Sequence, residues 1–368
     1  ASRSGPCADL ALLCDLAYAH GLQAVDYVLP EQSGSERFAV LYEKPLAPPQ
    51  RVERMAVANI SSACIANCMM CSMPQVFRGH SIGTIAACAM FEELKICGFQ
   101  MVDTFGGEIS LRGDLLALIA AVKRLNMISN IISTGYRLDH SRVLALTSVG
   151  LDKVQISIDS PDAELHDRIR GSAGLFEHAC EAARAFRNSG RVFLEINSVI
   201  LPENVVQIKR LHSFVVEKLG IPHHRLFYCV QIPTALTEAH HLSPEQARHY
   251  FEKDYPELLR LSAQLGSSID FCPPVSPHDV SDAENLYEEI SRGHYNRLSR
   301  CEAPQRDLFI TPEGEIYPCV NPSIISRVKP LGRTGEIRII DALRSEAMEE
   351  ARRMAGLWPE CASCISKR

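Results

Sequence analysis

Six strand-then-helix units between residues 55 and 232 constrain the fold of this chain more than any other feature. Short runs rich in β-branched and apolar residues, such as MAVANISS and KVQISIDS, alternate with amphipathic stretches such as SIGTIAACAMFEELKICG, in units of roughly 25–35 residues. This alternation is typical of a parallel sheet covered by helices. Because a closed barrel of this kind needs eight units, we predict an α/β fold built on a partial (βα)6 TIM-like barrel.

The regions that flank these units have different patterns. Residues 1–50 form an N-terminal extension, in which CADLALLCDLAYAHGL predicts a helix and FAVLYEK a strand. We expect the core at residues 51–235 and a connecting segment that closes it at residues 236–298. Residues 299–368 predict a small α+β module, because FITPEGEIYP has the pattern of a β-hairpin with its turn at Pro312–Gly314.

Composition excludes several classes of function. The chain has 46% hydrophobic and 22% charged residues and a formal net charge of -6, which is ordinary for a globular protein and gives no basic surface for nucleic acid. Its apolar runs are too short for a membrane span. The first 20 residues do not have the pattern of a signal peptide. We therefore predict a cytoplasmic protein with no nucleic-acid or membrane partner.

Cysteine is unusually frequent, with 14 in 368 residues, and seven of them fall into two patterned groups. Cys64, Cys68 and Cys71 have the spacing C-x3-C-x2-C, and no fourth cysteine follows nearby. Clustered thiolates select zinc, copper(I) or iron–sulfur clusters. Zinc completed by a distant histidine such as His80 is one interpretation. An iron–sulfur cluster with one iron left open to a ligand is the other, because such clusters usually have four cysteines.

Small and polar residues follow the predicted strands where the chain leaves the sheet. They are Gly106, Gly107 and Glu108 after the second strand, Ser133 and Thr134 after the third, Ser157 and Asp159 after the fourth, Asn197 on the fifth, and Tyr228 and Cys229 on the sixth. Active-site residues of parallel α/β folds gather at the carboxyl ends of the strands. We therefore expect these residues and the cysteine loop to lie along one rim.

In this order, these motifs resemble those of the radical S-adenosylmethionine (SAM) superfamily over residues 55–230. The resemblance implies that Cys64, Cys68 and Cys71 hold a [4Fe–4S] cluster whose open iron binds SAM. It further implies that the SAM amino group is bound by Gly106, Gly107 and Glu108, and that Ser133 and Thr134 lie near the ribose. Ser157 and Asp159 would line the pocket, and Asn197 fits the fifth-strand position. Arg170, rather than Arg168, would reach the carboxylate. Met70 departs from the pattern, because the family often has an aromatic residue there to hold adenine; methionine is polarizable enough to lie on a ring.

The resemblance also implies the reaction type. One electron, from a donor such as flavodoxin or ferredoxin, would enter the cluster and cleave SAM. The resulting 5′-deoxyadenosyl radical would abstract a hydrogen atom from the substrate. The protein would supply orientation and exclusion of water.

The second cysteine group comprises Cys301, Cys319, Cys361 and Cys364. Cys319 follows Gly314 of the predicted hairpin with the spacing G-x4-C, and Cys361 and Cys364 form a later C-x2-C. A four-cysteine zinc ribbon is one interpretation. The segment also resembles the auxiliary-cluster modules of radical SAM proteins, called SPASM or, in short form, twitch. The resemblance implies one auxiliary [4Fe–4S] cluster. Four protein ligands would leave it no open iron, so it would move electrons and not bind substrate.

An electron-accepting auxiliary cluster favours oxidation. The short module resembles the aminocyclitol and sugar dehydrogenases of natural-product and antibiotic biosynthesis, so we predict an oxidoreductase that converts an alcohol of a small polar substrate into a ketone. Polar residues near the sixth strand, among them His223 and Tyr228, are candidates for substrate contact, because a histidine is a suitable base near neutral pH.

Two other reactions fit the same motifs. An epimerase would return a hydrogen atom from a cysteine thiol, for which Cys229 is the best-placed candidate. A peptide-maturing enzyme is the second alternative, although residues 1–50 are short for the winged-helix peptide-recognition domain of many such relatives. A non-enzymatic iron–sulfur protein would not need the SAM-pocket motifs.

Overall fold

The computed structural model describes residues 23–28, 37–42, 54–71, 77, 79–228, 242–272, 301–320, 325, 328–355 and 357–358. The strands are β1 Gln23–Val28, β2 Arg37–Tyr42, β3 Met55–Asn59, β4 Met101–Phe105, β5 Ile128–Ser133, β6 Lys153–Ser157, β7 Phe193–Ile200, β8 His223–Tyr228, β9 Ser268–Cys272, β10 Asp307–Ile310, β11 Glu315–Tyr317 and β12 Gly332–Arg333. The α-helices are α3 Thr84–Ile96, α4 Leu115–Arg124, α5 His140–Ser148, α6 Ala163–Arg170, α7 Leu175–Ser189, α8 Ile208–Ser213, α9 Pro244–His249, α10 Tyr255–Gln264, α13 Ala303–Arg306, α15 Ile339–Leu343 and α16 Glu346–Met354. Short 3-10 or π segments are Ile109–Leu111, Val205–Gln207, Phe214–Lys218 and Tyr250–Asp254.

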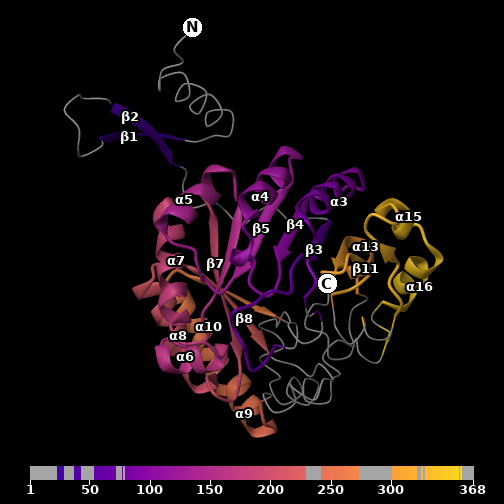
Figure 1. Ribbon diagram of the computed structural model, residues 1–368. Helices are drawn as coiled ribbons and strands as arrows, with labels where there is room; N and C mark the ends of the chain where they lie inside the picture. Colours follow the sequence, from indigo (N-terminus) through magenta and orange to yellow (C-terminus); the bar gives the residue numbers. More distant parts are fainter. Residues whose placement is uncertain are drawn as a thin grey trace.

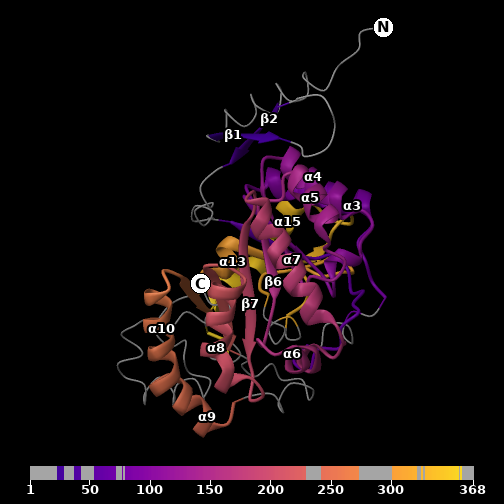
Figure 2. The same ribbon diagram turned by 90° about the vertical axis from the view of Figure 1, so that its left-hand side faces the viewer.

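One curved sheet of ten strands organises the molecule, in the order β12-β11-β10-β3-β4-β5-β6-β7-β8-β9. The eight strands from β10 to β9 pair in parallel, and β11 and β12 add antiparallel to one edge. The six predicted strands are β3 to β8, and the α/β partial-barrel prediction is confirmed. Figures 1 and 2 show helices α3, α4, α5, α7 and α8 along the outer face of the sheet.

The edges of the sheet differ from the prediction. Strand β9 lies in residues 236–298, expected to be only a connecting segment, and it pairs in parallel with β8. Strand β10 of the C-terminal region pairs in parallel with β3, the first strand of the core. The hairpin expected around Pro312–Gly314 is present as β10 and β11. The C-terminal region thus extends the core sheet, which a local pattern of alternating residues cannot reveal.

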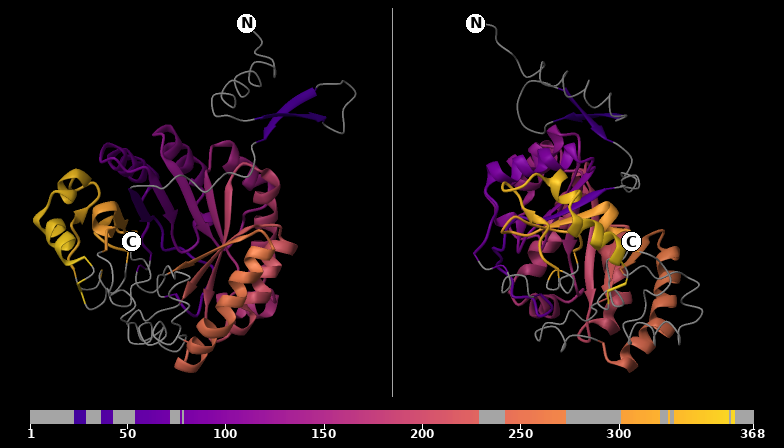
Figure 3. Two further views of the ribbon diagram at one scale, coloured as in Figure 1. Left: turned by 180° about the vertical axis from the view of Figure 1, so that it is seen from behind. Right: turned by 90° about the vertical axis from the view of Figure 1, so that its right-hand side faces the viewer.

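The C-terminal elements pack against the start of the core. Figure 3 shows them, in yellow, beside β3 and α3. The side chain of Glu93 on α3 accepts a hydrogen bond from the backbone N–H of Ile339 at 2.6 Å, at the start of α15. The rings of Phe105 and Phe309 lie 6.4 Å apart. These contacts place the described part of the C-terminal region next to β3, the strand that precedes the first cysteine group.

In the N-terminal extension, β1 and β2 form a separate two-stranded antiparallel sheet. Strand β2 confirms the strand predicted from FAVLYEK, whereas β1 was not predicted. The helix predicted at CADLALLCDLAYAHGL lies outside the described residues. Within the part of the chain that the structure describes, no helix combines the length and apolarity that a membrane crossing requires.

Helix α6 positions part of the cysteine loop, and its sequence explains both of its ends. The Asp162 side chain accepts a hydrogen bond from the backbone N–H of Leu165, which caps the first turn. The helix stops at Gly171, whose φ of 63° is left-handed and suits glycine. Leu165 and Ile169 are buried on one face together with Arg170. A buried arginine at the end of a helix is therefore carried toward the interior of the protein.

A chain of polar contacts crosses six neighbouring strands, from β4 to β9. The amide of Asn130 donates to Asp103 at 2.9 Å and lies 3.5 Å from the oxygen of Gln155. Gln155 donates to Glu195 at 2.7 Å, and Lys153 pairs with the same carboxylate at 2.9 Å. Arg225, 3.6 Å from Glu195, continues the chain to Asp270 on β9. Unpaired buried charges are costly, so these groups stabilise one another only as a set.

Glu195 is the centre of that chain, and its removal is expected to destabilise the fold. Glu195→Ala leaves the buried Lys153 ammonium without its closest countercharge, and breaking a buried pair costs about 3–5 kcal/mol. Burial raises the pKa of Glu195, but Lys153 and Arg225 outweigh it and hold the pKa below its usual value. The carboxylate therefore stabilises the fold at neutral pH, and this contribution is lost as the pH falls below about 4.

Urea denaturation of the wild type and of Glu195→Ala, at neutral pH and at pH values below about 4, measures the difference and its loss in acid. The double variant Lys153→Met/Glu195→Leu is the control, because it removes both charges and is expected to lose less stability than Glu195→Ala alone. Equal losses in the two variants would contradict the ion-pair explanation.

Candidate active site at the carboxyl edge of the sheet

A cavity opens where the strands β3 to β6 end. It brings together residues from the cysteine loop, the ends of four strands and helix α6. The lining residues are Cys64, Ala66, Asn67, Cys68, Met70, Cys71, Phe105, Gly106, Gly107, Ile132, Ser133, Thr134, Ser157 and Arg170. The rim predicted from the sequence is therefore present. Of the ten predicted cluster and pocket residues from Cys64 to Ser157, nine line the cavity, and Glu108 does not.

The cysteine loop is held by backbone hydrogen bonds to the end of β4. The N–H of Gly107 donates to Ser61 O at 2.8 Å, and the N–H of Glu108 donates to Ala63 O at 2.7 Å. A Cβ added to Gly107 would lie 2.4 Å from Ala63 O and 2.6 Å from Cys64 Cβ. A Cβ at Gly106 would lie 2.4 Å from Ser61 O. The glycine pair is thus required because the loop approaches the backbone too closely for any side chain.

The other side of the loop is attached to α6. The N–H of Asn67 donates to Arg170 O and that of Met69 donates to Ile169 O, both at 3.0 Å. Gly171 again allows the close approach, because a Cβ there would lie 2.3 Å from Asn67 O. The loop is therefore fixed at two ends, one on β4 and one on α6.

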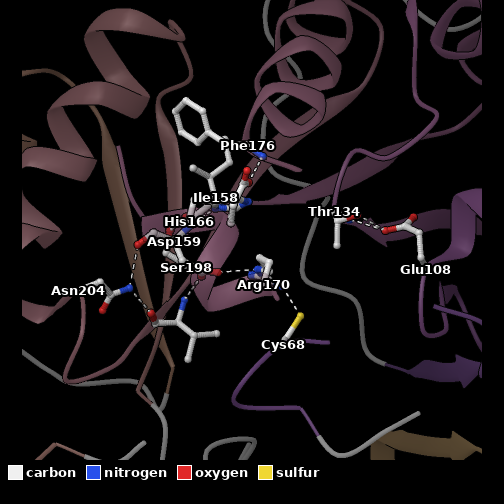
Figure 4. Close-up of polar contacts among 12 residues, drawn as sticks. Cys68, Glu108, Thr134, Ile158, Asp159, His166, Arg170, Phe176, Ser198 and Asn204 are labelled. Atoms are coloured by element: carbon white, nitrogen blue, oxygen red, sulfur yellow. Dashed lines mark hydrogen bonds and ion pairs between the residues drawn. The ribbon is translucent and has the colours of Figure 1, made fainter. Parts of the chain in front are cut away.

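Glu108 supports the site without lining the cavity. Its side chain is fully buried and accepts four hydrogen bonds: from Ser110 N at 3.0 Å, Ser133 Oγ at 2.6 Å, Thr134 N at 2.7 Å and Thr134 Oγ1 at 2.5 Å. Figure 4 shows the contact with Thr134. A carboxylate has about four acceptor positions, so this one is saturated by protein donors. In this structure the carboxylate joins the end of β4 to the end of β5. The expected contact of Glu108 with an amino group of a ligand stays a prediction.

Of the two arginines of α6, Arg170 lies at the cavity, and its expected contact with a carboxylate stays a prediction. Arg170 lines the cavity and is only 8% exposed, whereas Arg168 is exposed. Its Nε donates to Asp159 Oδ2 at 2.6 Å. Burial lowers the pKa of Arg170, but the neighbouring Asp159 and Cys68 outweigh burial and raise it above the usual value. The guanidinium is therefore a permanent cation at the cavity wall.

Asp159 is fully buried and is not among the residues that line the cavity, so its expected place in the ligand pocket stays a prediction. Its carboxylate accepts a hydrogen bond from Val199 N at 2.9 Å as well as from Arg170. Asn204, which the sequence motifs did not single out, donates to Asp159 O and Val199 O, both at 2.8 Å. Asn204 thereby joins the ends of β6 and β7, and only the folded contact could identify it.

Ser157 and Asn197 lie side by side in the register of β6 and β7. Ser157 lines the cavity, as predicted. Asn197 is 7% exposed, and its Oδ1 is buried with no hydrogen-bond partner among the described residues. A buried acceptor without a donor is costly. It therefore indicates a position where a ligand hydroxyl or amino group would fit.

Met70 lies at the boundary between the cavity and a small apolar cluster. It lines the cavity and packs with Leu165, Ile169 and Leu201. A thioether in this place offers a soft, apolar surface to a flat ligand. The predicted adenine contact thus has a suitable residue, and it stays a prediction.

The thiols of Cys64, Cys68 and Cys71 face one cavity. Burial, together with the charges of Cys68, Glu108 and Cys71, raises the pKa of Cys64 to about 11. Only the thiolate binds metal, so this thiol ionises when a cation is bound. Among the described residues, no three Cys, His, Asp or Glu side chains converge on a point for a single ion. Separated thiols suit a cluster, in which each cysteine binds a different iron.

His80 does not complete a zinc site with these cysteines. Its Nε2 lies 3.7 Å from Glu313 Oε1, in the turn between β10 and β11, and its side chain is exposed. The zinc interpretation of the cysteine loop is thus not supported by the position of His80.

The second cysteine group is only partly described. Cys301 is buried against Ala303 and Ala355, so it lies beside the end of α16, and Cys319 is half-buried just after β11. Cys361 and Cys364 lie outside the described residues. They follow α16 in the sequence. Their assignment to the same cluster as Cys301 and Cys319 stays a prediction.

His223, Tyr228 and Cys229 were predicted to face the substrate, and the structure places His223 and Tyr228 at opposite ends of β8. His223 begins β8. Its ring lies 4.6 Å from that of Phe193 at the start of β7, in a tilted arrangement, and its Nδ1 contacts Ser268 at the start of β9. It therefore lies at the amino edge of the sheet, opposite the cavity, a position that does not favour its predicted role as a base. Tyr228 ends β8 at the correct edge, and Cys229 lies outside the described residues.

Comparison with known proteins identifies two segments of the chain. Residues 58–215 match the radical SAM superfamily, and residues 301–365 match the iron-sulfur cluster-binding domain called SPASM. The chain therefore carries a radical SAM domain followed by a SPASM domain. These two domains imply a SAM-binding cluster and an auxiliary [4Fe–4S] cluster as cofactors, as predicted.

Individual relatives were found both in sequence and in structure. The PqqA peptide cyclase of Gluconobacter oxydans (strain 621H) is 28% identical over 276 residues, which cover 74% of this chain and 71% of the relative. Streptococcus suis SuiB, in its structure bound to precursor peptide SuiA, has a TM-score of 0.66 at 18% identity and covers 85% of this chain and 70% of SuiB. Native anSMEcpe with bound AdoMet has a TM-score of 0.61 at 15% identity, over 82% of this chain and 83% of the other.

The residues of this chain fit these cofactors. Three thiols and the Arg170 cation line one cavity, and a pair of glycines leaves part of its wall without side chains. The amide oxygen of Asn197, which has no partner among the described residues, lies on the strand next to Ser157. Cys64, Cys68 and Cys71 would hold the cluster, while Ser157, Arg170 and Asn197 have the donors and acceptors for the polar groups of SAM.

Gly107→Ala is expected to prevent assembly of the cluster in the cysteine loop, since the added Cβ would collide with Ala63 O and Cys64 Cβ. The SPASM cysteines are elsewhere, so iron and sulfide content after anaerobic reconstitution should fall toward half of the wild-type value. Gly113→Ala is the matched control, because no atom lies within 4 Å of a Cβ at Gly113. Full iron loading of Gly107→Ala would contradict the steric argument.

Proposed function

We propose that this radical SAM enzyme modifies a peptide, forming a bond between two side chains with the net loss of two hydrogen atoms. The observation that carries the proposal is the similarity to a PqqA peptide cyclase, which is 28% identical over 74% of this chain. This replaces the small polar substrate expected from the sequence. The likeness to solved structures supports the shared fold only.

When bound, the cofactors supply a 5′-deoxyadenosyl radical for hydrogen-atom abstraction and a one-electron acceptor in the SPASM domain. The chain supplies the geometry. The loop that holds Cys64, Cys68 and Cys71 is attached to β4 and α6, so the position of the cavity is fixed before any ligand binds. Cys301, Cys319, Cys361 and Cys364 are proposed as the auxiliary ligands.

The cavity residues divide into those that would contact SAM and those that hold them. Arg170 and Ser157 in the cavity, and Asn197 beside Ser157 on β7, offer a cation, a hydroxyl and an amide, which match a carboxylate and the hydroxyl groups of a ribose. Met70 and Phe105 give the cavity its apolar wall. Glu108 and Asp159 act behind them as positioning residues. Preorganised groups of this kind cost no reorganisation when the ligand binds.

The SPASM domain is joined to the strand that precedes the cysteine loop. Strand β10 pairs with β3, and Glu313 in the following turn lies beside His80 at the end of the loop. This supports a substrate position between the two cysteine groups, where an electron left on the substrate could pass to the auxiliary cluster. A separate one-electron donor, such as flavodoxin or ferredoxin, would reduce the SAM-binding cluster.

The test uses reconstituted enzyme, SAM, a reductant and synthetic peptides translated from the small reading frames that flank the gene. We expect 5′-deoxyadenosine, together with a peptide lighter by two hydrogen atoms whose fragment spectrum shows an internal crosslink. A Cys64→Ala/Cys68→Ala/Cys71→Ala variant is the control and should form neither product. Oxidation of an aminocyclitol or sugar alcohol, with every peptide unchanged, would overturn the proposal in favour of a dehydrogenase.

A further inference from the structure

Arg170 contacts one of the cysteines of the loop. Its Nη1 lies 3.9 Å from Cys68 Sγ in hydrogen-bonding geometry, while its Nε is engaged by Asp159 at 2.6 Å. Figure 4 shows the guanidinium lying between the carboxylate and the sulfur. The side chain is 10% exposed and that of Asp159 is fully buried. A cation is therefore held next to a thiol in a site with little water to screen it.

Asp159 cannot easily move, and this fixes the direction of the arginine. Its second carboxylate oxygen accepts from Val199 N at 2.9 Å, and its backbone N–H donates to His166 Nδ1 at 3.1 Å. The amide of Asn204 binds its carbonyl oxygen at 2.8 Å. The anchor thus uses the ends of β6 and β7, which are buried strands of the central sheet.

The sulfur is fixed relative to the arginine by the backbone as well. The residues on both sides of Cys68 are hydrogen-bonded to α6. The N–H of Asn67 donates to Arg170 O, and the N–H of Met69 donates to Ile169 O. Cys68 therefore sits between two backbone hydrogen bonds to the same turn of helix that carries the guanidinium. The contact between Nη1 and Sγ is a property of the folded loop and not of one mobile side chain.

We propose that Arg170 raises the reduction potential of the cluster in the cysteine loop by donating a charge-assisted hydrogen bond to the Cys68 thiolate. Net charge and hydrogen bonds to sulfur are among the factors that set the potentials of iron–sulfur clusters. A cationic donor withdraws electron density from the thiolate and stabilises the reduced, more negative cluster. Asp159 is the positioning residue, because it orients the guanidinium from the side away from the sulfur.

This role does not depend on the substrate and is compatible with a contact to SAM. A guanidinium has five N–H donors, of which Asp159 and Cys68 engage one each. The remaining donors can bind a carboxylate. Measuring the potential without SAM and without peptide therefore separates the cluster contact from ligand binding, and its outcome is independent of whether the enzyme modifies a peptide.

The test is a potentiometric titration of the reconstituted full chain, followed by electron paramagnetic resonance. The signal that is missing from a Cys64→Ala variant identifies the cluster in the loop. In Arg170→Gln we expect the equilibrium constant for its one-electron reduction to fall at least tenfold, which is a shift of about 59 mV to more negative potential. Arg168→Gln, on the exposed face of the same helix, is the control and should keep the wild-type potential.

Arg170→Gln leaves the buried Asp159 carboxylate without its countercharge and could destabilise the fold. A second variant therefore tests the same contact without an unpaired charge. Asp159→Asn/Arg170→Gln removes both charges, keeps the net charge of the pair at zero and retains amide groups that can hydrogen-bond. It too should titrate at a more negative potential, because the lost cation lies nearer to the sulfur than the lost anion. A wild-type potential in both variants, with full iron content, would overturn the proposal.

Discussion

The close approach of the cysteine loop to the end of β4 is the contact on which the site depends. Two backbone hydrogen bonds, from Gly107 to Ser61 O and from Glu108 to Ala63 O, hold the loop against a strand end that has no side chains in the way. Glu108 continues this connection inward by accepting four hydrogen bonds from Ser110, Ser133 and Thr134. The positions of the thiols are thus set by neighbouring strands of a rigid sheet, before a cofactor is present.

Much of this could be predicted from the sequence because the signals are local. Alternating strand and helix patterns predicted β3 to β8, and the spacing of Cys64, Cys68 and Cys71 predicted the loop of the cluster. Gly106, Gly107, Ser133, Thr134 and Ser157 were placed at the cavity because each follows a strand in a parallel sheet.

Other features depend on contacts between residues far apart in the chain. Pairing of β10 with β3 joins segments about 250 residues apart, and no local pattern specifies it. Glu108 and Asp159 were expected to face a ligand, but burial among protein donors directs both carboxylates to their neighbours. His223 was assigned to the wrong edge because its position within β8 depends on where that strand begins. Asn204 has no sequence signal, since its amide acts through two backbone carbonyl groups.

Buried charge is used differently in the two halves of the sheet. Away from the cavity, Lys153, Glu195 and Arg225 neutralise one another within a chain of polar contacts across the strands. At the cavity, Arg170 is only partly neutralised, because Asp159 occupies one side of the guanidinium and the other side is directed to Cys68. Charged groups whose pKa is shifted by their surroundings gather at functional sites, so the side of the guanidinium that faces Cys68 is the side expected to have a function.

The pairing of β10 with β3 has a consequence for how the two domains can exist apart. In the intact chain, β3 is an interior strand, with β4 on one side and β10 on the other. Removal of the SPASM domain would turn β3 into an open edge with unpaired backbone groups, which is a template for association with other chains. The two domains therefore share one hydrogen-bonded sheet and form one folding unit, and evolution could exchange the SPASM domain only together with a replacement for its first strand.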